Sequence, residues 1–456
     1  MNKTFIDQLI TFLATPAGLI GVVIGALMLL KATSSRQTSW LMFSLCCFAS
    51  SLNIFADRFV KTPPLLFPLQ QIRASGRPLA IVLLILLVLL AIQTQGTWRR
   101  WVIPKPIKYL MFVQFVIFFK TVVYGSLEFA FISAMTFGGI VFMLQRGPGQ
   151  WLQDDENFRL AVKSIAVVGL IFVVANTYQY ILNPYAITFV HSRFLGTTGN
   201  PQHAAVLLAA TIPCLMFSIQ SHPRWNFFKF LWLVTLLIVV YFLLLTGSRT
   251  GLLMGIVSIL LFFRNNGGAW FRVILFIGIS AALLLPFLEP DSLATSSGID
   301  SSVSARFAST ENSRESAWYW MWNSFTNNIL FGEPLRGDRM GHGENSWLSA
   351  AANLGLTGLI PMLLMGWESI KLIWQLNQLG NRQKYYFFQT SVVIAGLGSM
   401  LVGSVFEAFL LGNITFSLLV FLMYLVMGAY LVEVDRVRTY YASVEPEYPD
   451  DVGLYQ

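Results

Sequence analysis

The chain has 456 residues, of which 55% are hydrophobic and only 11% are charged. Soluble domains carry about 25% charged residues, so this composition excludes a sizeable soluble domain and indicates an integral membrane protein. The net charge of +8 does not indicate nucleic-acid binding, because the basic residues form short clusters between hydrophobic segments.

Apolar runs long enough to cross a hydrocarbon core of about 30 Å recur along the whole chain. They do not alternate with polar residues, so they predict helices and not transmembrane strands. The first run is about 22 residues long and no small-residue cleavage pattern follows it, so we interpret it as a retained span and not as a signal peptide. The three cysteines (Cys46, Cys47 and Cys214) fall within predicted spans and are interpreted as apolar packing residues.

The expected fold class is therefore all-α, a polytopic transmembrane helical bundle. The sequence predicts thirteen spans, with twelve as the alternative because Lys120 and Glu128 interrupt the fourth and fifth: 9–30, 39–56, 78–94, 107–124, 127–144, 161–183, 204–220, 229–246, 251–264, 270–288, 346–366, 386–405 and 411–432. Lys120, Glu128, Glu368 and Glu407 lie in or near these spans, and we interpret them as structural pairs or interfacial residues.

Short basic loops alternate with less basic ones along the predicted bundle. By the positive-inside rule, the basic side is cytoplasmic. The opposite side then carries the loop 184–203, the turn 247–251 and the long loop 289–345. Aromatic and apolar residues at helical spacing predict an interfacial or periplasmic helix at 313–330 within that long loop.

These features divide the chain into four parts. Residues 1–183 form N-terminal transmembrane helices, 184–370 contain the candidate catalytic region, 371–432 form the last helices, and 433–456 form an acidic, proline-bearing tail. The composition of the tail predicts a disordered cytoplasmic end.

Three arginines, Arg193, Arg249 and Arg314, are expected on the external side, where a cation at membrane level generally has a functional reason. Arg193 lies in a glycine-bearing turn that leads into a helix start, whose free amides can bind an anion. Arg249 and Ser248 lie in a Gly-Ser-Arg-Thr-Gly turn between two apolar helices, which fixes the guanidinium for two-pronged phosphate pairing. Alternatively, Arg249 reaches lipid headgroups and Arg193 caps a neighbouring helix.

The segment 341–348, Gly-His-Gly-Glu-Asn-Ser-Trp-Leu, places a histidine and a carboxylate at the start of an apolar helix. His342 and Glu344 can each accept a proton near neutral pH once the surroundings tune them, so either is a candidate general base. In the alternative interpretation, Glu344 and Asn345 only cap the helix.

In combination, these motifs resemble the O-antigen ligase and O-antigen polymerase family of bacterial membrane glycosyltransferases, over roughly residues 185–370. The resemblance implies a metal-independent, inverting enzyme without a cofactor in the bacterial inner membrane, with its active site facing the periplasm. Its donor would be a glycan linked to undecaprenyl pyrophosphate, held by Arg193, Arg249 and Arg314. Ser248 and Asn345 would support the site. The acceptor would be a glycan or a lipid, and a chain-length regulator is a possible partner.

One departure from the family pattern bears on the acceptor. The ligases that join O-antigen to lipopolysaccharide core have histidine before the asparagine, whereas this chain has Glu344 before Asn345 and His342 two residues earlier. This carboxylate resembles the polysaccharide polymerases, so an O-antigen or exopolysaccharide polymerase is favoured. A ligase that transfers glycan to lipid A core or to protein is the alternative. A lipid-linked sugar flippase or an anion transporter is less favoured, because no two halves with matching interrupted helices are recognisable.

Overall fold

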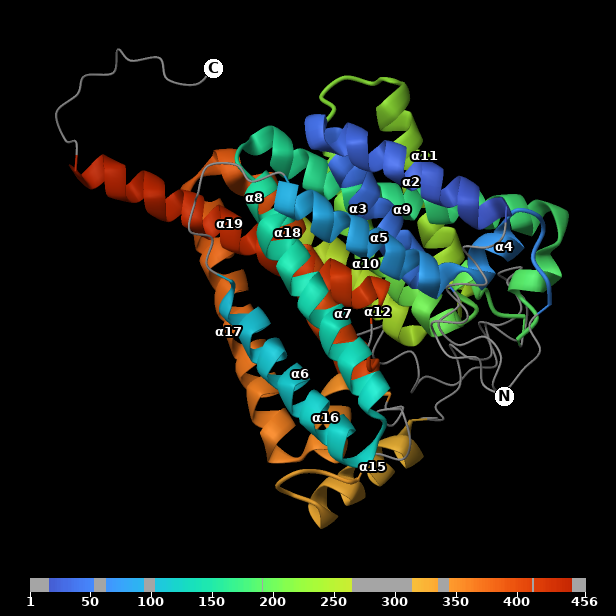
Figure 1. Cartoon of the computed structure of the whole chain (residues 1–456). Helices are drawn as coiled ribbons and strands as arrows, with labels where there is room; N and C mark the ends of the chain where they lie inside the picture. Colours follow the sequence, from blue (N-terminus) through green and yellow to red (C-terminus); the bar gives the residue numbers. More distant parts are fainter. Residues whose placement is uncertain are drawn as a thin grey trace, which may run out of the picture.

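The structure is a computed structural model that describes residues 16–52, 63–93, 103–190, 192–264, 314–334, 344–411 and 414–444. All regular elements in these ranges are helices (Figure 1). The α-helices are α2 (Pro16–Ser34), α3 (Arg36–Ser51), α4 (Leu69–Ala74), α5 (Gly76–Gln93), α6 (Lys105–Tyr124), α7 (Leu127–Arg146), α8 (Pro148–Trp151), α9 (Asp155–Leu182), α10 (Pro201–Gln220), α11 (Phe227–Leu245), α12 (Arg249–Phe262), α15 (Glu315–Asn327), α16 (Ser346–Leu354), α17 (Leu356–Arg382), α18 (Phe387–Phe406) and α19 (Phe416–Val444). Three short 3-10 helices are η1 (Pro184–Ile187), η2 (Gly196–Thr198) and η5 (Lys384–Tyr386).

The helices have the length and composition of membrane spans. Within the described ranges, eight are long and apolar enough to cross a membrane, and shorter apolar helices lie at Val23–Ser34, Pro78–Gln93 and Arg249–Phe262. The predicted polytopic helical bundle is thereby confirmed. The predicted span 270–288 lies outside the described residues, as do most of the long loop and the end of the tail. The helix predicted at 313–330 is present as α15.

Helix α10 forms the centre of the bundle, where it packs against α9, α11, α12 and α18. Small residues allow this packing: a Cβ added to Gly251 would lie 2.4 Å from the Cβ of Ala205. Only glycine therefore lets the first turn of α12 approach α10 so closely. This contact fixes the turn between α11 and α12, which carries Arg249.

The predicted continuous span 346–366 is wrong, since Gly355 divides it into α16 and α17. Gly355 has φ 63°, and a Cβ there would lie 2.5 Å from the carbonyl carbon of Leu330. The chain after α15 occupies this space, where the Leu356 amide donates to Ile329 O at 2.8 Å. Lys120 on α6 also donates to Phe331 O and Asn353 O. The break thus joins α15, α16 and α6 at one end of the bundle (Figure 1).

The connections between helices gather at two ends, as the predicted alternation requires. At one end, the loop 183–200 contacts the α11–α12 turn, and the start of α15 contacts the start of α12. At the other end, Arg264 donates to Asn377 and Ser391, and Arg382 pairs with Asp435. The described site residues therefore lie at one end of the bundle, and the basic residues Arg264 and Arg382 lie at the other.

Candidate functional site

The loop 183–200 holds Arg193 against the end of α11. Asn176 on α9 accepts a hydrogen bond from the Thr197 amide at 2.9 Å, and the Phe194 amide donates to Leu245 O at 2.9 Å. Gly196 and Gly199 adopt left-handed φ values of 58° and 67°, which permit the tight path of this loop. The buried Arg193 side chain then donates through Nε to Thr246 O at 2.7 Å.

The turn between α11 and α12 is short because the N-cap of α12 follows closely after α11 ends at Leu245. Ser248 is the N-cap of α12, where its Oγ accepts from the Gly251 amide at 3.2 Å. Arg249 is the first residue of the helix and is partly buried. Thr250 is buried and accepts from Arg314 Nη1 at 2.9 Å. Ser248 therefore caps the helix that begins at Arg249.

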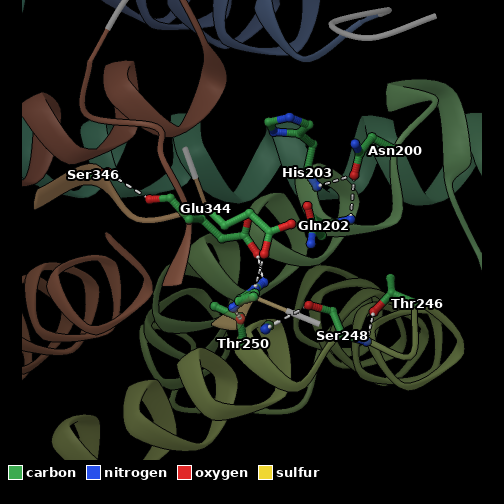
Figure 2. A network of polar contacts seen from close by, with 11 residues as sticks. Asn200, Gln202, His203, Thr246, Ser248, Thr250, Glu344 and Ser346 are labelled. Carbon is green, nitrogen blue, oxygen red and sulfur yellow. Dashed lines mark hydrogen bonds and ion pairs between the residues drawn. The ribbon is translucent and has the colours of Figure 1, made fainter. Parts of the chain in front are cut away.

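Arg314, the residue before α15, is the centre of the site. Figure 2 shows the network of polar contacts around it, with Thr250 and Glu344 labelled. Its Nε lies 3.0 Å from Glu344 Oε2, and its Nη2 lies 2.5 Å from Glu407 Oε1. With the bond from Nη1 to Thr250, three nitrogens of one guanidinium contact three separate parts of the chain. The predicted phosphate-binding arginine thus lies beside the predicted base.

The start of α16 is fixed to the end of α18. Asn345 is the N-cap of α16 and accepts from the amides of Trp347 and Leu348 at 2.8 and 2.9 Å. Ser346 Oγ donates to Glu407 O at 2.7 Å, and Trp347 Nε1 donates to Ser404 Oγ at 3.0 Å. Asn345 thus caps the helix, as the alternative interpretation proposed, and the same segment places Glu344 beside Arg314.

Glu407 is a site residue that the sequence analysis assigned to structural pairing or an interfacial position. It follows α18 directly and lies outside the spanning segment, with only 8% of its surface exposed. Burial raises the pKa of the Glu407 carboxyl to about 7, although Arg314 lowers it and Glu344 raises it further. Arg193 also lowers this pKa, so all four side chains share one electrostatic environment. The sequence signal that could have identified it is an acid directly after an apolar span.

Arg73 on α4 is a second residue that the sequence analysis did not assign to the site. It is buried at 4% exposure, and its Nη2 would lie 3.4 Å from a Cβ added to Gly199. Its guanidinium therefore lies beside the Arg193 loop. The buried arginines Arg73 and Arg193 thus come from segments far apart in the sequence. No local motif reveals that they lie close together.

The remaining predicted residues fall into two groups. His342 lies outside the described residues. Lys120 and Glu368 have the structural partners that the sequence analysis expected: Lys120 donates to main-chain carbonyls, and Glu368 pairs with Lys371 at 3.0 Å. Glu128 is exposed in the first turn of α7. Across the described ranges, no group of three or more histidine, cysteine, aspartate or glutamate residues could hold a metal ion.

No protein-family model matches the chain, and no characterised protein matches its sequence. The functional assignment therefore depends on the residues of the site itself.

Proposed function

We propose that the protein is an inverting membrane glycosyltransferase that uses a glycan linked to undecaprenyl pyrophosphate and polymerises polysaccharide repeat units. The main support is that Arg193, Arg314, Glu344 and Glu407 gather at one end of the bundle. This combination supplies the two groups that the reaction needs, cations for a departing pyrophosphate and a carboxylate to accept a proton.

In the proposed reaction, an acceptor hydroxyl oxygen attacks the anomeric carbon of the donor sugar. The new C–O bond forms while the bond from that carbon to the pyrophosphate oxygen breaks, which inverts the configuration. The leaving oxygen carries both electrons of the broken bond, and guanidinium groups stabilise its charge. The acceptor proton passes to Glu344, which is the more exposed of the two site carboxylates.

The proposed location is the bacterial inner membrane, with the site on the periplasmic side. The basic residues of the opposite end support this orientation through the positive-inside rule. Helix α15 also exposes Tyr319, Trp320 and Trp322, and aromatic side chains of this kind are enriched at membrane interfaces. A site at this level would meet a donor whose lipid lies in the bilayer and whose sugars lie in water.

Polymerase is favoured over ligase because a carboxylate, and not a histidine, precedes Asn345. A transporter is less supported, since transporters bind their substrates near the membrane midplane, whereas these charges lie at helix ends.

The decisive experiment supplies purified protein in lipid nanodiscs with a labelled repeat unit on undecaprenyl pyrophosphate. The acceptor is, in separate reactions, the same lipid-linked repeat unit, lipid A core or a protein. Polymerisation predicts a ladder of longer lipid-linked products with the first acceptor only. Label on lipid A core or on protein would identify a ligase instead. If no acceptor is labelled, but reconstituted vesicles move the donor across the bilayer, the protein is a flippase.

A further inference from the structure

Two carboxylates, from Glu344 and Glu407, share one guanidinium at Arg314, whereas an ordinary ion pair has a single carboxylate. Nε and Nη2 lie on one edge of a planar guanidinium, the edge that pairs with two oxygens of a single phosphate. Here one oxygen at this edge comes from Glu344 and the other from Glu407. Two different side chains therefore occupy the two positions that one phosphate group would take.

The two carboxylates are not held equally. The Glu407 side chain is 10% exposed, bonds to Nη2 directly, and has its main-chain oxygen fixed by Ser346. The Glu344 side chain is 37% exposed, and its Oε2 contacts Nε without hydrogen-bond geometry. Displacing Glu344 therefore costs less than displacing Glu407, because the Glu344 side chain is more exposed and its contact with Nε lacks hydrogen-bond geometry.

We propose that a phosphate group displaces Glu344 from Arg314 while Glu407 keeps the guanidinium in place. This inference rests on the proposed function and extends it, since the carboxylate released by the donor is also the proposed base. In the donor-free protein, the Glu344 carboxylate contacts Arg314. Donor binding frees it beside the acceptor hydroxyl, so the base becomes available only when a sugar is ready for transfer. Glu407 is a positioning residue in this scheme.

The test measures binding of inorganic pyrophosphate to the purified full-length protein by calorimetry, which gives stoichiometry and Kd separately. Glu344→Gln removes the competing charge, so its Kd should fall roughly two- to fivefold, the range expected for a partly exposed ion pair. Glu407→Gln should raise the Kd in the folded fraction, because Arg314 loses its fixed partner. Glu315→Gln is the matched control: Glu315 is exposed, follows Arg314 directly and undergoes the same charge change.

A double variant keeps the test specific to Arg314. In an Arg314→Ala background, Glu344→Gln should no longer change the Kd. An unchanged or larger Kd in Glu344→Gln would overturn the inference. So would an equal decrease of the Kd in Glu315→Gln, or a decrease that persists in the Arg314→Ala background. An unaltered Kd in Glu407→Gln would exclude its positioning role.

The assay needs no glycan, so it separates the inference from the proposed function. If the wild type transfers glycan but Glu344→Gln does not bind pyrophosphate more tightly, the enzyme assignment stands and the displacement of Glu344 by phosphate is excluded. If Glu344→Gln binds pyrophosphate more tightly but the wild type transfers no glycan, the site binds anions with a displaceable carboxylate and the enzyme assignment is excluded.

Discussion

Arg314 connects parts of the chain that no local motif relates. Three of its contacts reach the start of α12, the segment before α16 and the end of α18. A lysine has a single ammonium and cannot occupy these three directions from one planar group. At the scale of single residues, the site therefore depends on guanidinium geometry as well as on charge.

Arg249 is the residue where this dependence is simplest to test. Arg249→Lys should lose most transfer activity and Arg249→Ala more, with a loss on the order of 2 to 4 kcal/mol in transition-state stabilisation if it holds the departing pyrophosphate. Initial rates in nanodiscs, normalised to the amount of folded protein, measure this effect. The same changes at the exposed Arg224, at the other end of the bundle, should have little effect. Normal turnover of Arg249→Ala would mean that Arg249 only contacts lipid headgroups.

Glu344 and His342 are alternative candidates for the proposed base, and position should decide between them. A base must reach the acceptor hydroxyl, and Glu344 lies beside Arg314. We expect Glu344→Gln to abolish transfer and His342→Ala to reduce it mildly, as measured by single-turnover rates with saturating donor. The opposite pattern in two folded, inserted variants would assign the base to His342 and leave Glu344 as a charge partner of Arg314.

Glu407 should make the stability of the protein depend on pH. The folded state binds the Glu407 proton more tightly than an unfolded chain does, since its pKa rises from 4.5 to about 7. The associated stability is complete below pH 4.5 and is lost as the pH rises through 7, an effect on the order of 3 kcal/mol. Thermal denaturation in detergent should show that Glu407→Gln loses less stability than the wild type between pH 5 and pH 8. Curves that stay parallel across this range would contradict the raised pKa.

The sequence predicted the arginines because each lies in a short local motif, such as the Gly-Ser-Arg-Thr-Gly turn around Arg249. It did not predict Glu407 or Arg73 as site residues, because their roles arise from contacts with segments far along the chain. Glu407 lies 93 residues from Arg314, and no periodicity or motif encodes that pairing. Candidate residues could thus be named from local motifs, whereas their tertiary partners could not.

At the scale of elements, the break between α16 and α17 orients the candidate base. The Gly355→Ala substitution should be strongly destabilising, because φ is 63° and the new Cβ would lie 2.5 Å from Leu330 main-chain atoms. We expect a lower melting temperature and loss of transfer, as the α15–α16 end shifts. Gly138→Ala on α7 is the control: a Cβ there has nothing within 4 Å, so alanine should be neutral or stabilising by up to about 1 kcal/mol.

Hydrophobicity predicted the helices well, because apolar length depends on the bilayer and not on packing. It could not predict the division at Gly355, since the stretch remains apolar on both sides of the glycine. The division follows from the main chain of residues 329–332, which occupies the space that a continuous helix would need. The helices were thus predictable from their own residues, whereas the break at Gly355 depends on a segment that packs against it.

At the scale of the whole molecule, the two ends should face different compartments. In a variant without native cysteines, Gly125→Cys at the site end should react with a membrane-impermeant maleimide in intact cells, and Pro223→Cys at the basic end should react only after permeabilisation. Both positions are exposed, and both lie in turns between helices. Labelling at position 223 alone would invert the proposed orientation and place the site in the cytoplasm.

The pairing of Arg314 with Glu407 also has a consequence for biosynthesis. Chains are made from the N-terminus at about 5–20 residues per second, so Glu407 is added roughly 5–19 s after Arg314. During this interval the guanidinium has been synthesised but lacks its buried counterion. A chain that ends before residue 407 has every arginine of the site but lacks the buried carboxylate that contacts Arg314 Nη2. Synthesis must therefore pass residue 407 before the Arg314–Glu407 pair of the site can assemble.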